Sequence, residues 1–342
     1  MSDQRLFRIV LLLLACLSAG FTAVSVSGDP LDPYLIPWEY ESIAETALLD
    51  GQMHFFFMAG EGYPVGDSSD SDIEKWGDSC LVAFPNGELM LIDSGMPKYA
   101  PILIENLRRL GVERLDYLII SHPHDDHAGA VYTDDGLPDH IGIGQAYYNG
   151  AYNANWSDPQ RLEKVMAAHD IPLQAISAGF TLDIGDVRLQ VISPEPDVIG
   201  QTFKTTPDIN NSSIVLRMDY GDFSALFTGD IYQLQEMELV RNAADLLDAD
   251  LLKMPHHGNS TSNSKKFADA VKPQLAVATG RLVIDAMQYY VYTKNGAKVL
   301  FDYCDGYIHV YTDGEEITWE HSRERTIDFY DKYEYENLMA VN

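Results

Sequence analysis

The chain has 342 residues, and 46% of them are hydrophobic, which is enough for a sizeable buried core. Its formal net charge is -29 and its isoelectric point is about 4.4. Because so acidic a surface repels polyanions at long range, the composition argues against unassisted nucleic-acid binding. A cationic substrate, a small substrate and a high-salt habitat all remain compatible with it.

The first residues of the chain have the pattern of an export signal. Two arginines precede an apolar stretch at residues 9–14, and small residues follow. The Leu-Leu-Ala-Cys sequence that ends at Cys16 resembles a bacterial lipobox, whereas residues 9–26 are also about long enough for an uncleaved anchor. We therefore predict an extracytoplasmic protein, secreted or membrane-anchored, with residues 1–28 as its signal or tether.

A linker and a glycine-rich loop come next. Residues 29–52 are predicted to form a linker and N-terminal segment, and residues 53–59 a strand. Residues 60–77 contain four glycines and five acidic residues, which is typical of a solvated loop. The alternative is an acidic lid in which Trp76 and Tyr63 form aromatic walls for a cationic group.

The apolar pattern then predicts an α/β domain built in layers. Strands at 79–84 and 88–93 flank an Asn-Gly pair, a strong hairpin signal. An amphipathic helix at 97–110 and a buried strand at 115–120 follow. The next predicted elements are strands at 145–148 and 187–193 and a helix at 158–169. Strands and helices in this order are expected to carry a site at the strand ends.

The buried strand at 115–120 runs directly into the sequence Ser-His-Pro-His-Asp-Asp-His. Three imidazoles and a carboxylate within six residues are the side chains that a cation such as Zn²⁺ prefers. Alternate residues of an extended segment point the same way, so His122 and His124 can bind one ion. The adjacent Asp126 and His127 then turn toward a second position. One loop can thus supply two ligands to each of two metals.

The second half of the chain is predicted to build another sheet with two more polar strand ends. Its elements are a hairpin at 213–219 and 223–228, helices at 233–242 and 261–271, and strands at 250–254, 275–279, 298–301 and 307–312. The hairpin ends close to Asp230, and the strand at 250–254 ends in Pro-His-His-Gly, which contains His256 and His257. We assign residues 53–320 to one domain and residues 321–342 to a C-terminal tail.

Together these strand ends resemble the metallo-β-lactamase superfamily. The motifs that carry the resemblance are Asp93-Ser94-Gly95, the His-x-His-x-Asp-His sequence, Asn210-Asn211-Ser212-Ser213, Thr228-Gly229-Asp230-Ile231, and Leu252-Lys253-Met254-Pro255-His256-His257-Gly258-Asn259-Ser260. Within that superfamily they are similar to the hydrolase domain of the ComEC/Rec2 DNA-uptake proteins and to the bacterial phosphorylcholine esterases. The resemblance implies an α/β fold of the four-layer αββα sandwich type.

The resemblance also implies a dinuclear metal centre. His122 and His124 would bind one ion, and Asp126 and His127 would bind the other. Asp230 would give one oxygen to each ion, and His257 would be the closing ligand of the second ion. His256 would then lie beside the substrate as a donor, although the reverse assignment of His256 and His257 stays open. Asp126 and His256 are the residues expected to be catalytic.

Further residues are expected to lie beside the ligands or the substrate, namely Asp93, Asn211, Ser213 and Trp76. Asp93 should hydrogen-bond the metal-binding loop. Many superfamily members have another histidine before the Thr-Gly-Asp motif, but only His140 and His169 are candidates here and neither has a helpful context. The first ion is therefore expected to be completed by solvent or by a substrate oxygen.

The expected activity is hydrolysis by a metal-bound hydroxide, with two divalent cations, Zn²⁺ or else Mn²⁺, lowering its pKa. A phosphodiester is the favoured substrate, in a small molecule or a cell-surface phosphocholine group, and nucleic acid is disfavoured by the acidic charge. Residues 280–285 depart from the Tyr-Gly-His-Pro type segment usual in the ComEC branch. The alternatives are therefore hydrolysis of a lactone, thioester or amide, including β-lactams, and a non-catalytic surface binder that keeps a structural metal.

Overall fold

The computed structural model of the chain describes residues 31–59, 76–280 and 286–324. The chain forms two units, Met1–Pro33 and Tyr34–Asn342. Only residues 31–33 of the first unit are described, where the short 3-10 helix η1 (Asp32–Tyr34) begins. The predicted export signal and the loop segment that contains Tyr63 lie outside the described residues. The following description concerns the second unit.

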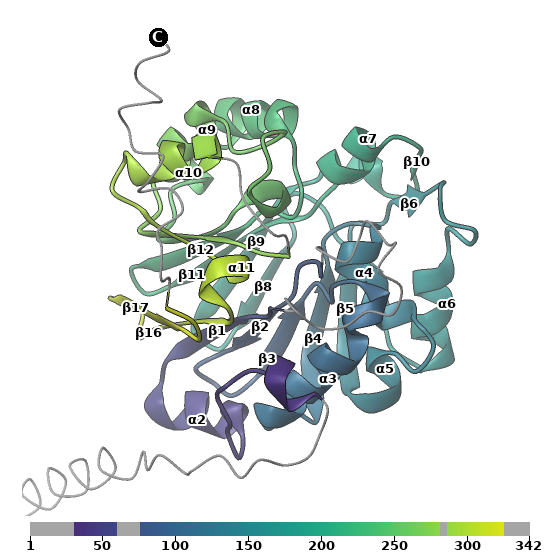
Figure 1. Cartoon of the computed structure of the whole chain (residues 1–342). Helices are drawn as coiled ribbons and strands as arrows, with labels where there is room; N and C mark the ends of the chain where they lie inside the picture. The colour runs from purple at the N-terminus through teal and green to yellow at the C-terminus, as the bar shows by residue number, and fades with distance from the viewer. Residues whose placement is uncertain (1–30, 60–75, 281–285, 325–342) are drawn as a thin grey trace, which may run out of the picture. The chain divides into compact units, whose positions relative to one another are not determined.

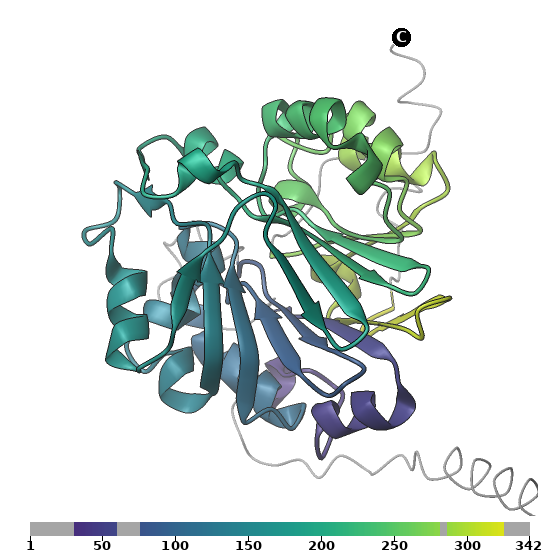
Figure 2. The ribbon, with the colours of Figure 1, turned by 180° about the vertical axis from the view of Figure 1, so that it is seen from behind.

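The first of two large sheets has the strand order β17-β16-β1-β2-β3-β4-β5-β7 (Figures 1 and 2). Its strands are β1 (Met53–Phe57), β2 (Cys80–Ala83), β3 (Leu89–Ile92), β4 (Arg114–Ile120), β5 (Gly142–Tyr148), β7 (Leu173–Ala175), β16 (Ile308–Thr312) and β17 (Ile317–His321). The strands from β17 to β3 pair antiparallel, and those from β3 to β7 pair parallel. Parallel pairing brings the carboxyl ends of β3 and β4 to one edge of the sheet.

The second sheet has the order β15-β14-β13-β12-β11-β9-β8. Its strands are β8 (Thr181–Ile184), β9 (Val187–Ser193), β11 (Val215–Tyr220), β12 (Phe223–Phe227), β13 (Leu251–Lys253), β14 (Leu275–Ala278) and β15 (Lys298–Phe301). The short strands β6 (Tyr152–Asn153) and β10 (Thr202–Phe203) pair separately. The expectation that residues 307–312 belong to this sheet is wrong, because β16 pairs with β1 in the first sheet.

Helices cover the outer face of each sheet (Figure 1). Those over the first sheet are α2 (Ile43–Asp50), α3 (Ala100–Arg109), α4 (Asp125–Tyr132), α5 (Leu137–His140) and α6 (Arg161–Ala168). Those over the second sheet are α8 (Gln233–Asn242), α9 (Lys265–Val271) and α10 (Ala286–Thr293). The other helical segments are α7 (Thr206–Asn211), α11 (Asp302–Asp305), η2 (Pro97–Tyr99), η3 (Pro196–Val198), η4 (Ala244–Leu246) and η5 (Pro255–Gly258). No helix in the described ranges is both long and apolar enough to cross a bilayer.

Three apolar clusters separate the four layers. In β1 the side chains alternate, so Phe55 and Phe57 pack between the two sheets while Phe56 packs under the helices of the first sheet. In β13 the same alternation sends Leu251 between the sheets and Leu252 toward the helices of the second sheet. The predicted αββα sandwich is confirmed, and its sheets deliver several strand ends to one edge.

Candidate metal centre

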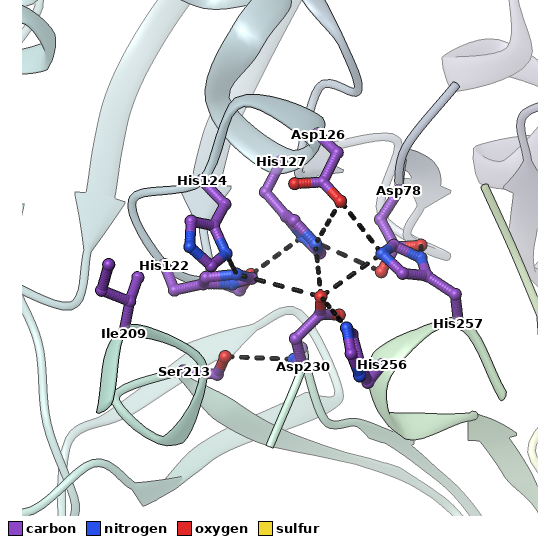
Figure 3. Close-up of polar contacts among 12 residues, drawn as sticks. Asp78, His122, His124, Asp126, His127, Ile209, Ser213, Asp230, His256 and His257 are labelled. Atoms are coloured by element: carbon purple, nitrogen blue, oxygen red, sulfur yellow. Dashed lines mark hydrogen bonds and ion pairs between the residues drawn. The ribbon is translucent and has the colours of Figure 1, made fainter. Parts of the chain in front are cut away.

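Four polar segments meet where strands of the two sheets end. Residues 121–127, here called the metal loop, follow β4 and run into the first turn of α4, and Asp93 follows β3. Asp230 comes after β12, and η5 with its two histidines comes after β13. Figure 3 shows His122, His127, His256 and His257 arranged around the carboxylate of Asp230.

His122 and His124 form one side of the cluster. The Nε2 atom of His122 lies 3.0 Å from Nδ1 of His124 and 4.0 Å from Oδ2 of Asp230. His122 is fully buried, and this burial, together with the neighbouring His127, lowers its pKa well below the usual value. A neutral imidazole keeps a nitrogen lone pair available for a cation. Ile209 lies beside these two histidines in Figure 3.

Asp93 fixes the orientation of His127. One of its carboxylate oxygens, Oδ2, lies 2.8 Å from Nδ1 of His127, and the other accepts a 2.7 Å hydrogen bond from the backbone N–H of Ser121. Burial lowers the pKa of His127, but the carboxylates of Asp230 and Asp93 raise it to about 10. Because Nδ1 of His127 is held by Asp93, the opposite nitrogen, Nε2, points at Asp230 and lies 3.2 Å from its Oδ2 atom.

Asp78 holds His257 in the same way. Its Oδ1 atom lies 3.0 Å from Nδ1 of His257, which also lies 2.9 Å from the backbone oxygen of Thr279. The Nε2 atom of His257 then lies 3.1 Å from Oδ2 of Asp126 and 3.3 Å from Oδ2 of Asp230. Both His127 and His257 are thus held from the outside at Nδ1 and present Nε2 to the centre.

Asp230 stands at the centre of the cluster and is 1% exposed. Its backbone N–H donates to Oγ of Ser213 at 3.0 Å, and the N–H of Tyr232 donates to Oδ1 of Asn211. Two residues of the Asn-Asn-Ser-Ser segment thus hold the loop that carries Asp230. All of its contacts with imidazoles are made by Oδ2, whereas Oδ1 lies 3.6 Å from Nζ of Lys253. Oδ2 of Asp230 therefore faces the imidazoles, and Oδ1 faces Lys253.

His256 faces the cluster from its more open side. Its backbone has φ of 48° and that of His257 has φ of 55°, a left-handed conformation that costs energy in residues other than glycine. Nδ1 of His256 lies 2.5 Å from Oγ1 of Thr261, and Nε2 lies 3.9 Å from Oδ2 of Asp230. The side chain of His256 is 15% exposed and that of His257 is 1% exposed. The deeper imidazole is therefore His257.

A model of the metallo-β-lactamase superfamily matches residues 76–278, more than half of the chain and all of the cluster. The chain belongs to the metallo-β-lactamase superfamily. It is 28% identical over 221 residues to ComE operon protein 3 of Bacillus subtilis, covering 59% of this chain and 26% of that protein. It is 29% identical over 204 residues to Competence protein ComA of Neisseria gonorrhoeae, covering 59% of this chain and 25% of that protein.

These similarities, with Recombination protein 2 of Haemophilus influenzae at 28% identity over 206 residues, place this metallo-β-lactamase-superfamily chain in a ComEC/Rec2-like branch. The chain spans about a quarter of the length of the curated relatives it matches. Among solved structures it is similar to the metallo-beta-lactamase fold protein YhfI from Bacillus subtilis, with a TM-score of 0.48, 14% identity, and coverage of 73% of this chain and 96% of that one.

The donor atoms of this superfamily member fit a divalent cation. Asp78, His127, Asp230 and His257 are all buried, and each offers an atom within 4.8 Å of the others. Within the described part of the chain, Nε2 of His127 makes no well-formed hydrogen bond, although it lies 3.2 Å from Oδ2 of Asp230. Buried imidazole and carboxylate groups packed against one another in this way are costly unless a cation or another ligand satisfies them. A divalent metal could supply that partner.

Some predicted residues lie apart from the cluster. The alternative prediction for Trp76 was an aromatic wall of an acidic lid, but the residue is 4% exposed and its Nε1 atom donates to Oδ2 of Asp302 at 2.8 Å. It therefore anchors the segment before Asp78 and is not an exposed wall. His140 and His169 both pair with acidic side chains at the α5 and α6 helices, at 2.9 and 3.6 Å, and neither joins the cluster.

Two residues of the site were not predicted, Asp78 and Lys253. Both are buried, and Nζ of Lys253 forms an ion pair with Oδ2 of Asp78. Burial lowers the pKa of Lys253, but Asp78 and Asp230 raise it above the usual value. A lysine within the apolar sequence Leu-Leu-Lys-Met was one available signal. Gly77, directly before Asp78, was a second signal, because glycine allows two backbone segments to approach closely. In the structure a Cβ atom at this position would overlap the backbone oxygen of Asp126.

Proposed function

We propose that the protein is an exported hydrolase that uses two divalent cations, Zn²⁺ first and Mn²⁺ as the alternative, to cleave phosphodiester bonds. The observation that carries the proposal is the set of distances among four donor atoms, Nε2 of His127 and His257 and Oδ2 of Asp126 and Asp230. The four nitrogen-to-oxygen distances are 3.1, 3.2, 3.3 and 3.9 Å. Ligands about 2.0–2.1 Å from a tetrahedral Zn²⁺ lie roughly 3.3 Å from one another, so these atoms suit one ion.

Asp126 is a better ligand for this ion than Asp78. The carboxylate of Asp78 already contacts Lys253, His257 and the hydroxyl of Thr279, and although burial raises its pKa, Lys253 and His257 lower it below the usual range. Asp78 thus behaves as an ionised partner that orients His257. Asp126, by contrast, directs Oδ2 toward Nε2 of His257 on the inner side of the ring.

The other ion would be held by His122, His124 and Oδ2 of Asp230. This group has fewer protein donors than the first, and Ile209 stands beside it. Bound divalent cations of this kind lower the pKa of water and polarise a phosphoryl or carbonyl oxygen. With only three protein donors, this group would be completed by solvent or by a substrate oxygen.

His256 is the chain's own candidate for proton transfer. Its Nδ1 atom contacts Thr261 and its ring lies 5.0 Å from the ring of Tyr232, so two neighbours fix the imidazole. The Nε2 atom is directed toward the centre and can donate a hydrogen bond to a developing oxyanion or a leaving group. An imidazole in this position assists hydrolysis without being a metal ligand.

The substrate class is inferred from charge and from the relatives. The names of the relatives refer to competence and recombination, which favours a nucleic-acid substrate, whereas a net charge of -29 disfavours one. We favour a phosphodiester in a small molecule or in a cell-surface group such as phosphocholine. An N-terminal signal or tether in residues 1–28 would bring the protein to such a substrate.

The test is hydrolysis of bis(p-nitrophenyl) phosphate by the protein without residues 1–28, loaded with Zn²⁺ or Mn²⁺. The Asp126→Ala variant should lose turnover. The matched control is Asp125→Asn, whose carboxylate is the next one in the sequence but pairs with Arg161 and Tyr132 outside the cluster. Its turnover should stay within about twofold of the original, because it removes no converging oxygen.

Each outcome of this test has a distinct meaning. Turnover that disappears in Asp126→Ala and persists in Asp125→Asn supports a metal-dependent phosphodiesterase. Absence of turnover with two ions bound per chain would reject phosphodiester cleavage and favour lactone, thioester or amide substrates. Absence of bound metal would reject the dinuclear centre itself.

A further inference from the structure

Lys253 is a buried cation in an apolar strand. Its neighbours in and after β13, Leu252 and Met254, are 0% exposed, and Lys253 itself is 4% exposed. An ammonium group is taken out of water only where close partners offset its desolvation. The partners of Lys253 therefore indicate what the residue does.

All of these partners belong to the metal centre. The Nζ atom donates to the backbone oxygen of Gly229 at 3.1 Å, forms an ion pair with Oδ2 of Asp78, and lies 3.6 Å from Oδ1 of Asp230. The ammonium group approaches Asp230 from the side opposite to the imidazoles, since every imidazole contact uses Oδ2. It also binds the loop that carries Asp230, because Gly229 is the preceding residue.

We infer that Lys253 is a positioning residue of the metal centre, which holds Oδ1 of Asp230 and Oδ2 of Asp78 so that one oxygen of each carboxylate faces the histidines. The inference rests on the proposed metal-dependent function and adds to it the residue that determines how Asp230 is presented. Asp230 then presents Oδ2 to the side on which the histidines would hold metal, while Oδ1 faces the ammonium group. Asp78 is held with Oδ1 against Nδ1 of His257.

The charge of the site supports this role. Asp78, Asp126 and Asp230 are buried carboxylates, and carboxylates this close to one another repel unless cations lie among them. Lys253 is a cation that the chain itself supplies, so part of the repulsion is offset before any metal binds. A lysine that only filled space in the core would be replaceable by methionine without any effect on bound metal.

The test uses Co²⁺, whose visible absorption bands depend on the number and geometry of its ligands. Lys253→Met removes the ammonium group and keeps much of the side-chain length. We expect it to change the band positions and intensities of the Co²⁺-loaded protein, and to lower kcat for bis(p-nitrophenyl) phosphate at least tenfold while KM stays within threefold. The matched control is Lys298→Met, which replaces an exposed lysine in β15 of the same sheet and should leave both readouts unchanged.

A second variant covers the case in which Lys253→Met does not fold, because it leaves Asp78 buried without its cation. The double variant Lys253→Met with Asp78→Asn removes the ion pair as a whole, and the amide oxygen can still accept from His257. This double variant should fold, as judged by circular dichroism, and its Co²⁺ bands should still differ from those of the original protein.

The outcomes separate this inference from the proposed function. If the original protein binds Co²⁺ and cleaves the phosphodiester but the double variant has the same bands and the same kcat, Lys253 has no positioning role. If the bands change in the variants while no protein cleaves the phosphodiester, the positioning role stands and the proposed substrate class is rejected. If the original protein binds no Co²⁺, both are rejected.

Discussion

Two regions of the protein bring buried histidines together with carboxylates, the metal centre and the His54–His309 pair on the neighbouring strands β1 and β16. In the pair, Nδ1 of His54 lies 3.1 Å from Nε2 of His309. The outer nitrogens contact acids, with Nε2 of His54 3.3 Å from Asp50 and Nδ1 of His309 2.9 Å from Glu320. The ring of His309 also stacks on Phe56 at 4.1 Å. All four ring nitrogens of the pair are therefore engaged with protein groups.

In the metal centre the same kinds of side chain are arranged differently. Asp93 and Asp78 contact the Nδ1 atoms of His127 and His257, and the Nε2 atoms of these two rings are left to converge on Asp230. The difference shows that convergence of nitrogen and oxygen donors defines a cation site, whereas a buried histidine with two protein partners is part of the core. The predictions below test this distinction.

The largest effect is expected from Asp230→Ala, which removes the oxygen that four imidazoles face. Turnover of bis(p-nitrophenyl) phosphate should fall roughly 10⁴-fold, because residues that act as a unit lose most of their effect together. Elemental analysis should find at least one fewer metal ion per chain. The control is Glu320→Ala, which removes the comparable carboxylate of the His54–His309 pair and should leave metal content unchanged. An Asp230→Ala protein with full metal content would contradict the assignment of this oxygen.

A smaller effect separates the two adjacent histidines of η5. His257→Gln should lose one of the two ions, because it removes an Nε2 atom within 3.3 Å of both Asp126 and Asp230. His256→Gln should keep both ions and reduce kcat about 100-fold, a typical loss for a general acid. Metal content by elemental analysis and kcat measured on the same samples distinguish the two. The reverse pattern would exchange the roles of His256 and His257.

Much of the fold could be predicted from the sequence because local patterns decide it. The pattern around Asn86-Gly87 predicted β2 and β3 to within one residue at each end, and α8 was predicted with its observed bounds, Gln233–Asn242. Partner choice was harder. The strand at 308–312 was predicted, but its pairing with β1 depends on a contact between residues more than 250 positions apart, and periodicity does not report such a contact.

The candidate site was predictable where its residues are adjacent in sequence, as in the metal loop. Residues 125–132 were not predicted as a helix, because the polar start of α4 coincides with the motif and hides its helical pattern. Asp78 was missed for a different reason. It joins His257 and Lys253 only through tertiary structure, in which its backbone N–H donates to the oxygen of Asp126. Lys253 itself was visible as a charge within an apolar strand but was not weighed as part of the site.

The smallest expected effect is at the His54–His309 pair. His309→Phe should keep the stack on Phe56 but leave Nδ1 of His54 and the carboxylate of Glu320 without their partner. The free energy of unfolding, measured with denaturant, should fall by about 1–2 kcal/mol, since a buried polar atom is left unsatisfied. Metal content and turnover should not change. The double variant His54→Phe with His309→Phe should recover part of the loss, because replacing both partners of a buried hydrogen bond removes the unsatisfied atom. A loss of bound metal in either variant would mean that the pair is coupled to the metal centre and is more than core packing.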